Sequence, residues 1–302
     1  MKRTAFIFPG QGSQYVGMGR DFQGSELFER ANQVLGFDLR KLCLEGPEDE
    51  LKKTAVTQPA IFTVSAVVLE ALSKGGLKAE AAAGHSLGEY SALYAAGSIS
   101  FEDGVRIVNL RGKFMQDAVP VGEGAMAAII GLPAEKVREI CAETGAEAAN
   151  INSPRQTVLS GKRDSVLKAA EAAKAAGAKR AVELPVSAPF HSTLMKPAQE
   201  KLAEELSRIE IRDAGIPVVS NVSARFEAKA GAIRELLIKQ VTSPVLWVDS
   251  VNTMIAEEIN TFVEVGPKKV LSGLIKNIDK SVSVFNAEDS ATVDSTLKEA
   301  AK

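Results

Sequence analysis

The chain has 302 residues, of which 45% are hydrophobic, 25% charged and 5% aromatic. This is the composition of a folded globular protein, and it excludes collagen-like, low-complexity and disordered classes. Lysine and arginine total 36 against 38 acidic residues, giving a net charge of −2, so no overall positive field favours nucleic acid or a membrane surface as a partner.

Neither an export signal nor a membrane span is expected. The apolar run after the N-terminal basic residues covers only 5–8 before Pro9 and Gly10 interrupt it. The uncharged stretch at 125–134 is much shorter than the ~20 residues that cross a bilayer. Cys43 and Cys141 lack the spacing of a disulfide framework or a zinc site, so we expect two buried thiols in a cytoplasmic protein.

Short apolar strands alternate with helices along most of the chain. The strands are expected at 4–8, 79–84, 216–220, 260–265 and 281–286. The helices are expected at 58–74, 101–119, 195–209, 232–240 and 268–278. This alternation predicts an α/β fold with a mainly parallel sheet and helices on both faces.

One segment, residues 125–186, departs from that rhythm. Its apolar patterns follow the order strand, helix, strand, strand, helix, strand, which is typical of a ferredoxin-like unit. We therefore predict a small subdomain at 124–186, inserted between the two parts, 1–123 and 187–302, of a larger α/β catalytic subdomain.

A candidate nucleophile is Ser86, the serine of a G-x-S-x-G motif that runs from Gly84 to Gly88. A predicted strand precedes the motif and a helical pattern follows it at 89–96. In this context the glycines permit a tight turn that exposes the serine oxygen above the sheet. The alternative is a glycine-rich turn with an incidental serine.

The general base for this serine is inferred by elimination. Only two histidines exist, and His85 should point to the opposite face from its neighbour Ser86. His191 remains, in a turn-like stretch at 187–192, and a neutral imidazole there would activate the hydroxyl. The alternative is a structural histidine.

The loop at 8–14 follows the first strand and should reach the same sheet edge as the motif serine. Gln11 lies between two glycines, and the loop would supply a second oxyanion donor beside the Leu87 amide. A dinucleotide-binding loop is the rival interpretation, but Tyr15 occupies the position of its third glycine.

Arg111 falls on the apolar side of its predicted helix, whereas the other polar residues of that helix share the opposite face. An inward arginine requires an anion. Either a protein carboxylate forms a buried salt bridge with it, or the guanidinium binds a substrate carboxylate.

Eight segments in this order closely resemble malonyl-CoA:acyl-carrier-protein transacylases of bacterial type II fatty acid synthesis. The segments are FPGQGSQ at 8–14, TQPA at 57–60, GHSLGEYSAL at 84–93, RGKFMQ at 111–116, GAMAAIIG at 124–131, NSPRQTVLSG at 152–161, PFHS at 189–192 and VEVGP at 263–267. The resemblance spans essentially the whole chain. It implies a hydrolase-like body with the inserted ferredoxin-like lobe.

The resemblance also implies a ping-pong transfer through a malonyl-Ser86 ester, with His191 moving the proton in both directions. The main-chain carbonyl of Gln240 would orient His191. Gln11 and the Leu87 amide would stabilise the oxyanion.

For substrate binding, the resemblance implies that Arg111 holds the malonyl carboxylate, and that Gln58 and Asn152 line or brace the acyl and pantetheine channel. Phe190, beside the base, would disfavour an α-methyl branch by its bulk.

The implied partners are malonyl-CoA and acyl carrier protein. No cofactor, metal, nucleic acid or membrane is expected. The protein is expected to be a monomer. One alternative is a serine esterase or thioesterase that uses water as acceptor. Another is a trans-acting acyltransferase of polyketide synthesis. A non-enzymatic carrier-binding scaffold should have lost Ser86 or His191, and both are present.

Three positions depart from the family pattern. Lys268 and Arg155 stand where glycine is common, and Leu246 stands where arginine is common. The basic side chains of Arg155, Lys268, Lys269 and Lys276 either face an acidic carrier protein or are ordinary solvated charges.

Overall fold

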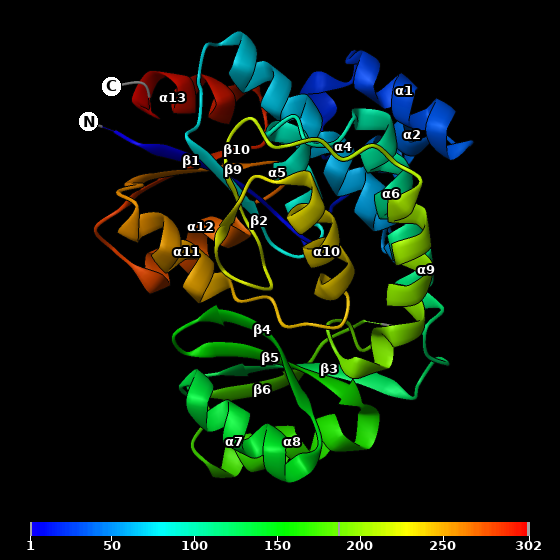
Figure 1. The fold of residues 1–302 in the computed structure, drawn as a ribbon, viewed down its shortest axis with the longest axis vertical. Coiled ribbons are helices and arrows are strands. Elements are labelled where there is room, and N and C mark those ends of the chain that lie inside the picture. Colours follow the sequence, from blue (N-terminus) through cyan, green and yellow to red (C-terminus); the bar gives the residue numbers. More distant parts are fainter. Residues whose placement is uncertain (1, 187, 301–302) are drawn as a thin grey trace.

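The computed structural model describes residues 2–186 and 188–300, which form two β-sheets with helices packed on both (Figure 1). The larger sheet has the strand order β10-β9-β1-β2-β7-β8. Its strands are β1 (Thr4–Phe8), β2 (Ala81–Gly84), β7 (Val218–Val219), β8 (Phe226–Glu227), β9 (Thr261–Val265) and β10 (Ser283–Ala287). All neighbours pair in parallel except β7 and β8, so the predicted mainly parallel α/β sheet is confirmed.

The helices packed around the larger sheet come from both halves of the chain. They are α1 (Glu26–Leu35), α2 (Leu39–Glu45), α3 (Glu48–Leu51), α4 (Thr54–Lys74), α5 (Gly88–Ala95), α6 (Phe101–Gln116), α9 (Lys196–Ser207), α10 (Ala230–Gln240), α11 (Trp247–Ala256), α12 (Val270–Ile278) and α13 (Ser290–Ala300). Short 3-10 turns lie at Arg20–Phe22 and Thr193–Met195.

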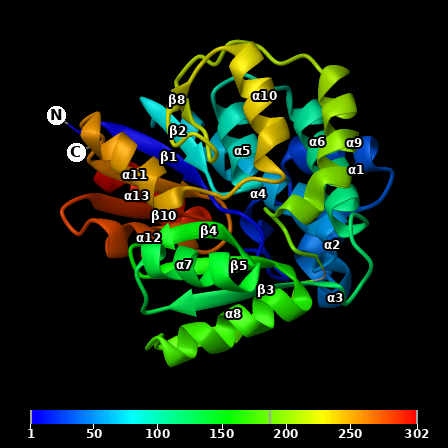
Figure 2. The ribbon, with the colours of Figure 1, turned by 60° about the horizontal axis from the view of Figure 1, so that its bottom comes forward.

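The central strand β1 is buried on both faces of the sheet, as expected for a parallel strand. Phe6 and Phe8 join a core formed with α4, α5, α6 and α9. Ala5 and Ile7 join a second core formed with α11 and α12. The two helical layers are visible on either side of the sheet in Figure 2.

The core helix α4 begins at Thr54, four residues earlier than the predicted start, and runs through Pro59. Proline has no N–H, so the Ala55 carbonyl loses its normal partner in the helix. The side chain of Asn109 on α6 replaces that donor, with Nδ2 at 2.7 Å from Ala55 O. A partner 54 residues away in sequence therefore allows the helix to pass through the proline.

Helix α4 is also the one helix in the described part of the chain that is long and apolar enough to cross a bilayer. Of its most apolar window, 78% is buried inside the protein. This is the property of a core helix, and α4 does pack against α6 in the main core.

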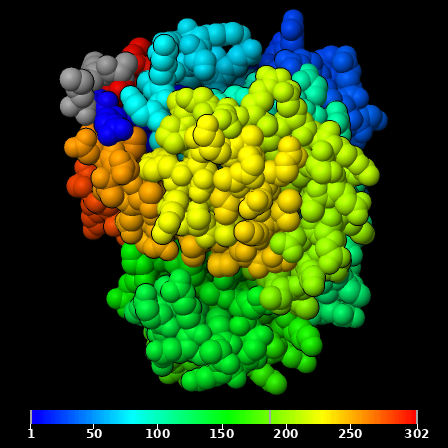
Figure 3. All heavy atoms as spheres, in the orientation of Figure 1, coloured from blue at the N-terminus to red at the C-terminus, as the bar shows by residue number. Residues whose placement is uncertain are grey.

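The second sheet is built from residues 124–183 and lies beside the larger body (Figure 3). Its antiparallel strands have the order β4-β5-β3-β6. The elements are β3 (Gly124–Ile130), α7 (Ala134–Thr144), β4 (Glu147–Ser153), β5 (Gln156–Lys162), α8 (Arg163–Ala175) and β6 (Arg180–Glu183). The predicted βαββαβ order is thus present. The division into subdomains at 1–123, 124–186 and 187–302 stays a prediction, and Ser187 itself lies outside the described residues.

The two faces of this smaller sheet have different environments. Ala125, Ala127 and Ile129 of β3 pack against α7 and α8 in a separate core, which also holds Cys141. Met126 and Ala128 point the other way and belong to the core of the large body. The alternation along one strand therefore gives the lobe a helical side and a side that faces the body.

Some elements differ from the sequence expectations. No helix was expected at the positions of α1, α2, α3, α11 and α13. The strand predicted at 216–220 is only Val218–Val219, because the Ser220 N–H donates to Arg225 O and turns the chain back into β8. Both cysteines are buried free thiols, as expected.

Candidate active site

Ser86 follows β2 at a sharp elbow and has a φ of 51°, in the left-handed region. The glycines of the motif are required by close approach rather than by their own φ. A Cβ at Gly84 would lie 1.9 Å from the Gly88 backbone, and one at Gly88 would lie 2.1 Å from Phe8 O. The elbow therefore presses against β1 and leaves the strained conformation to the serine.

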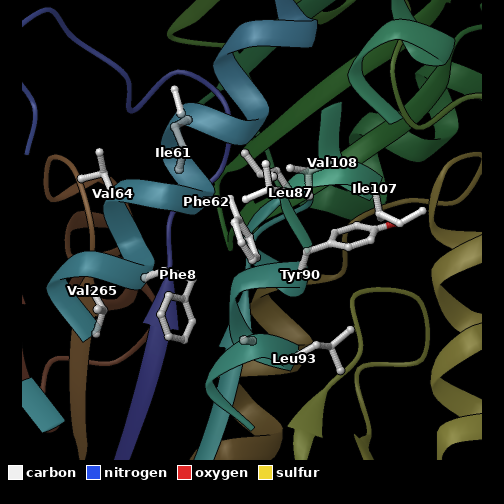
Figure 4. Close-up of a cluster of buried hydrophobic side chains, with 14 of the residues drawn as sticks. Phe8, Ile61, Phe62, Val64, Leu87, Tyr90, Leu93, Ile107, Val108 and Val265 are labelled. Carbon is white, nitrogen blue, oxygen red and sulfur yellow. The ribbon is translucent and has the colours of Figure 1, made fainter. Parts of the chain in front are cut away.

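The residues that follow Ser86 lie in a packed apolar cluster (Figure 4). Leu87 and the α5 residues Tyr90 and Leu93 are fully or almost fully buried. They lie in one cluster with Phe62 of α4 and Val108 of α6. Burial of these side chains fixes the helix that follows the serine.

The structure brings His191 to Ser86, although 105 positions separate them in the sequence. His191 Nδ1 donates to the Gln240 carbonyl at 2.9 Å and lies 3.2 Å from Ser243 O. Because Nδ1 carries the hydrogen, Nε2 is the acceptor that faces Ser86 Oγ at 2.7 Å. Burial, reinforced by the charge of Arg111, lowers the pKa of His191 to about 3, so the imidazole is neutral at neutral pH.

His85 points away from Ser86, as predicted from its position in the motif. Its Nε2 lies 2.8 Å from Asn152 Oδ1 in the lobe, and its ring packs against Trp247 at 5.7 Å between centroids. Burial lowers the pKa of His85 as well. This histidine therefore joins the elbow to the lobe.

Arg111 is only 1% exposed and its guanidinium reaches the nucleophile. NH2 donates to Ser86 Oγ at 3.0 Å and to Gln240 Oε1 at 2.9 Å, and NH1 donates to Gln58 Oε1 at 2.9 Å. Within 2–186 and 188–300, no carboxylate forms an ion pair with it, and its Nε has no hydrogen-bond partner. The charge is held by amide oxygens, and burial lowers the pKa of Arg111.

Gln11 and Leu87 both line the pocket beside the serine. Among the described residues, neither the Gln11 amide nor the Leu87 amide has a hydrogen-bond partner. The Gln11 loop lies so close to the elbow that a Cβ at Gly10 would be only 2.5 Å from His85 O. The Ser86 amide is already occupied, since it donates to Asn221 Oδ1 at 2.7 Å.

The nucleophile lies at the end of a cleft between the body and the lobe. A pocket of about 110 Å³ surrounds Ser86 and His191, and Gln58, Arg111 and Phe190 line it. It adjoins a larger groove of about 510 Å³ between the loop at 10–14, the lobe strands and α12. Asn152 lines this groove. The sequence-predicted site residues therefore share one cleft, apart from Gln240, which lies behind it.

Three contributions to the site were not predicted from the sequence. Glu89, 4% exposed, accepts Gln240 Nε2 at 2.6 Å and Asn221 N at 3.2 Å on one carboxylate oxygen. Burial raises the pKa of Glu89 to about 7. Asn221 and the side chain of Gln240 were also missed. One signal was available for Asn221, because it directly follows a predicted strand and so lies at the same sheet edge as Ser86.

The three departures from the family pattern have structural consequences. Lys268 has a φ of 62°, the region that favours glycine, and its Nζ donates to Gly12 O at 3.1 Å. The Arg155 guanidinium donates to Gly131 O at 3.1 and 2.8 Å, so it braces a turn in the lobe. The Leu246 N–H donates to Asn221 O at 3.0 Å. A role for these basic residues in carrier docking stays a prediction.

Comparison with known proteins agrees with this geometry. The family model described as the acyl transferase domain matches residues 5–299. The malonyl CoA-acyl carrier protein transacylase of Bacillus subtilis is 47% identical over an alignment 312 positions long, which covers 99% of this chain and 98% of that protein.

Solved structures are similarly close. The malonyl CoA-acyl carrier protein transacylase from Coxiella burnetii has a TM-score of 0.97 and 40% identity, covering 100% of this chain and 98% of that one. A malonyl-transacylase in complex with a type II PKS acyl-carrier protein has a TM-score of 0.96 and 43% identity, covering 98% and 99%. The resemblance expected from the eight motifs is confirmed: the chain belongs to the acyl transferase domain family, and its relatives there are malonyl CoA-acyl carrier protein transacylases.

Proposed function

We propose that this acyltransferase moves the malonyl group from malonyl-CoA to the phosphopantetheine thiol of an acyl carrier protein, through a malonyl ester of Ser86. The observation that supports it best is a buried arginine that has no carboxylate partner among the described residues and lies 3.0 Å from a serine that is itself 2.7 Å from a neutral histidine. A nucleophile, its base and an anion receptor thus occupy one small pocket.

In the first half-reaction, His191 Nε2 takes the proton of Ser86 as Oγ attacks the thioester carbonyl. Gln11 and Leu87 line the pocket, and their backbone N–H groups, which have no other partner among the described residues, donate to the oxyanion that forms. When the intermediate collapses, the carbon–sulfur bond breaks and the coenzyme A thiolate takes the proton from His191. Malonyl-Ser86 remains.

The second half-reaction uses the same groups in reverse. The carrier thiol gives its proton to His191, its sulfur attacks the ester carbonyl, and the oxyanion again binds the two amides. The bond to Ser86 Oγ then breaks, and His191 returns the proton to that oxygen. The Gln240 carbonyl keeps Nδ1 protonated throughout, so the base always presents Nε2 to the serine.

Arg111 supplies selectivity for a carboxylated acyl group. Its Nε–H has no partner in the described residues. Its hydrogen bonds go to neutral oxygens, and a hydrogen bond to a carboxylate is stronger than these. Because the site is buried, this charge-assisted contact is stronger than it would be in water. Phe190, at the pocket wall, leaves little space for a branch at the α-carbon.

The partners follow from the same chemistry. Coenzyme A and a carrier protein both present a phosphopantetheine arm, and the 510 Å³ groove leads to Ser86 from outside. Relatives act with acyl carrier proteins, and one solved neighbour is bound to a polyketide carrier. We propose a monomeric cytoplasmic enzyme that works without a metal or cofactor, with a fatty acid or a polyketide carrier as acceptor.

Intact-protein mass after brief exposure to malonyl-CoA tests the proposal. One added malonyl group, mapped to the peptide that contains Ser86 and absent in Ser86→Ala, is the expected result. An adduct on Cys43 or Cys141 would contradict it. The thioesterase alternative predicts steady release of free malonate without any thiol acceptor, at a rate that rivals transfer to the carrier.

A further inference from the structure

A buried carboxylate, Glu89, connects the groups that surround the nucleophile, yet it touches neither Ser86 Oγ nor His191. It lies in the first turn of α5, where the helix N-terminus favours a negative charge. One Glu89 oxygen accepts a hydrogen bond from the Gln240 side-chain amide at 2.6 Å and another from the Asn221 backbone N–H at 3.2 Å. No step of the transfer described above requires this residue.

Gln240 is the residue through which Glu89 acts. Its Oε1 accepts Arg111 NH2 at 2.9 Å, while its Nε2 donates to Glu89 and to Ser86 O at 3.0 Å. If the Gln240 side-chain amide rotated by half a turn, its nitrogen would face the Arg111 guanidinium and its oxygen would face the Glu89 carboxylate. The same Glu89 oxygen also accepts the Asn221 backbone N–H, so it serves as an acceptor whichever protonation state the carboxyl adopts, and together with Ser86 O it disfavours the rotated arrangement.

The orientation of Gln240 matters for Arg111, because it sets the direction of one guanidinium nitrogen, whereas the Tyr90 ring, with its centroid 5.6 Å from Arg111 Cζ, contacts the guanidinium as a whole. Gln58 binds NH1, and only Gln240 and Ser86 Oγ bind NH2 among the described residues. Ser86 Oγ becomes an ester oxygen once the enzyme is acylated, which weakens that contact. Gln240 is then the remaining fixed acceptor for NH2, and it places the guanidinium beside the acyl group.

We infer that Glu89 is a positioning residue for substrate selection: its carboxylate fixes the Gln240 side chain, which in turn aims Arg111 at the acyl group on Ser86. This inference rests on the proposed function, because it needs Arg111 to bind the malonyl carboxylate. Asn221, held by the same oxygen, keeps the Ser86 amide in place and couples the elbow to the network.

The test compares kcat/KM for malonyl-CoA and acetyl-CoA in Glu89→Ala, Glu89→Gln and the wild type. The Gln variant keeps an acceptor oxygen without the charge, whereas the Ala variant removes both. We expect Glu89→Ala to lower the malonyl-to-acetyl ratio by at least about tenfold, the effect of misplacing one charge-assisted hydrogen bond. Glu89→Gln should restore the ratio to within about threefold of the wild type, because the Asn221 N–H requires an acceptor at this position and therefore orients the new amide with its oxygen towards Gln240 Nε2.

Glu264→Ala is the matched control. Glu264 is also fully buried and accepts three hydrogen bonds, from Leu271 N, Ser272 N and Ser272 Oγ, but it caps α12 outside the pocket. It should lower the melting temperature and leave the malonyl-to-acetyl ratio unchanged. That outcome would show that lost stability alone does not change the malonyl-to-acetyl ratio.

Equal losses for both substrates in Glu89→Ala would overturn the inference, because a merely structural residue affects both alike. A loss in Glu89→Gln as large as in Glu89→Ala would also overturn it, since charge rather than amide orientation would be responsible. If Glu89→Ala does not fold, Glu89→Asp replaces it, because Asp keeps the charge and withdraws the acceptor by one methylene. The wild-type arm separates the two failures: without acylation of Ser86 by malonyl-CoA, the proposed function itself is wrong.

Discussion

The two walls of the cleft are built differently. On the body wall, Ser86 is hydrogen-bonded to both His191 and Arg111; the histidine and the arginine are almost entirely buried, and the serine is partly exposed. On the lobe wall, Ala128 and Val158 present apolar surface, and the polar groups are Asn150, Asn152 and Gln156. The body therefore holds the reacting groups in a fixed network, and the lobe shapes the path that leads to them.

The two walls are nevertheless docked through the backbone. Ile151 N donates to Val245 O at 2.9 Å and Val245 N donates to Ala149 O at 2.8 Å, so lobe strand β4 pairs with the segment that follows α10. That segment begins just after Gln240, whose carbonyl orients His191. The position of the lobe is thus tied to the position of the base. If the walls divide the work in this way, substitutions on the body wall should have the larger effects on catalysis.

The largest effect is expected for His191→Ala, which should slow both half-reactions by roughly 10²–10⁴, the usual contribution of a general acid–base. His85→Ala is the matched control, since its ring is partly buried and bonds to the lobe residue Asn152 instead of the serine. It should leave the proton-transfer step intact. Acylation by malonyl-CoA and transfer to a carrier thiol are measured separately. Similar losses in both variants would show that His191 is structural.

The pH profile sharpens the same contrast. Protonated His191 cannot accept the serine proton, so acylation is lost as pH falls through the pKa of the folded-state imidazole. The sequence alone predicts this limb near ~6.5. Burial and Arg111 lower that pKa to about 3, so acylation should persist at pH 5. Arg111→Ala removes one cause and should move the limb towards higher pH, measured with acetyl-CoA in both proteins. A wild-type limb near 6.5 would refute this environment for His191.

Arg111→Ala should lower kcat/KM for malonyl-CoA by at least roughly 10²-fold, because two charge-assisted hydrogen bonds contribute about 1.5–3 kcal/mol each. Transfer of acetyl should be spared or improved. In the wild type an acetyl group leaves the guanidinium buried without an anion, a cost that disappears with the charge. Equal losses for malonyl-CoA and acetyl-CoA would mean that Arg111 maintains the fold rather than selecting the substrate.

The difference between the walls also explains what could be predicted from the sequence. Ser86 was found by its motif, His191 by elimination between two histidines, and Arg111 by its place on the apolar side of α6. Each of these signals is local or compositional. Glu89 belongs to the same motif as Ser86, but its contacts depend on where α10 crosses α5 in the folded chain, and no pattern within either helix encodes that.

The fold shows the same division. The βαββαβ order of the lobe was predicted, because hydrophobic periodicity is a local property. The start of α4 was wrong, because the donor that compensates Pro59 comes from Asn109 on another helix. Long-range compensation of this kind is not visible in a single sequence.

On the lobe wall, Asn152→Ala should reduce kcat/KM by only about 2–12-fold, the range set by one neutral hydrogen bond of about 0.5–1.5 kcal/mol. The loss removes the acceptor of His85 and one polar group of the groove. Because both substrates share coenzyme A, malonyl and acetyl transfer should fall together. A selective loss for malonyl would place Asn152 with the carboxylate site and contradict the division between the walls.

The smallest effect concerns the rim of the groove, where Lys268 holds a left-handed conformation with φ of 62°. A non-glycine residue in that region costs about 1–2 kcal/mol, and glycine in the unfolded chain loses about 0.4–1 kcal/mol more entropy on folding. Both Lys268→Gly and Lys268→Ala remove the Nζ contact with Gly12 O. The two variants therefore differ only in backbone cost, and Lys268→Gly should be the more stable by about 0.5–1 kcal/mol.

Thermal unfolding of the two variants measures this difference, which corresponds to a melting temperature higher by about 1–4 °C in Lys268→Gly. The comparison with the wild type then isolates the Nζ contact, because Lys268→Ala keeps the strained φ and loses only that hydrogen bond. Acylation of Ser86 should change little in either variant, since Gly12 lies beside Gln11 but not in the pocket that surrounds Ser86. If Lys268→Gly slows acylation while Lys268→Ala does not, relief of strain at the rim repositions the Gln11 amide, and the rim belongs with the body wall as part of the oxyanion site.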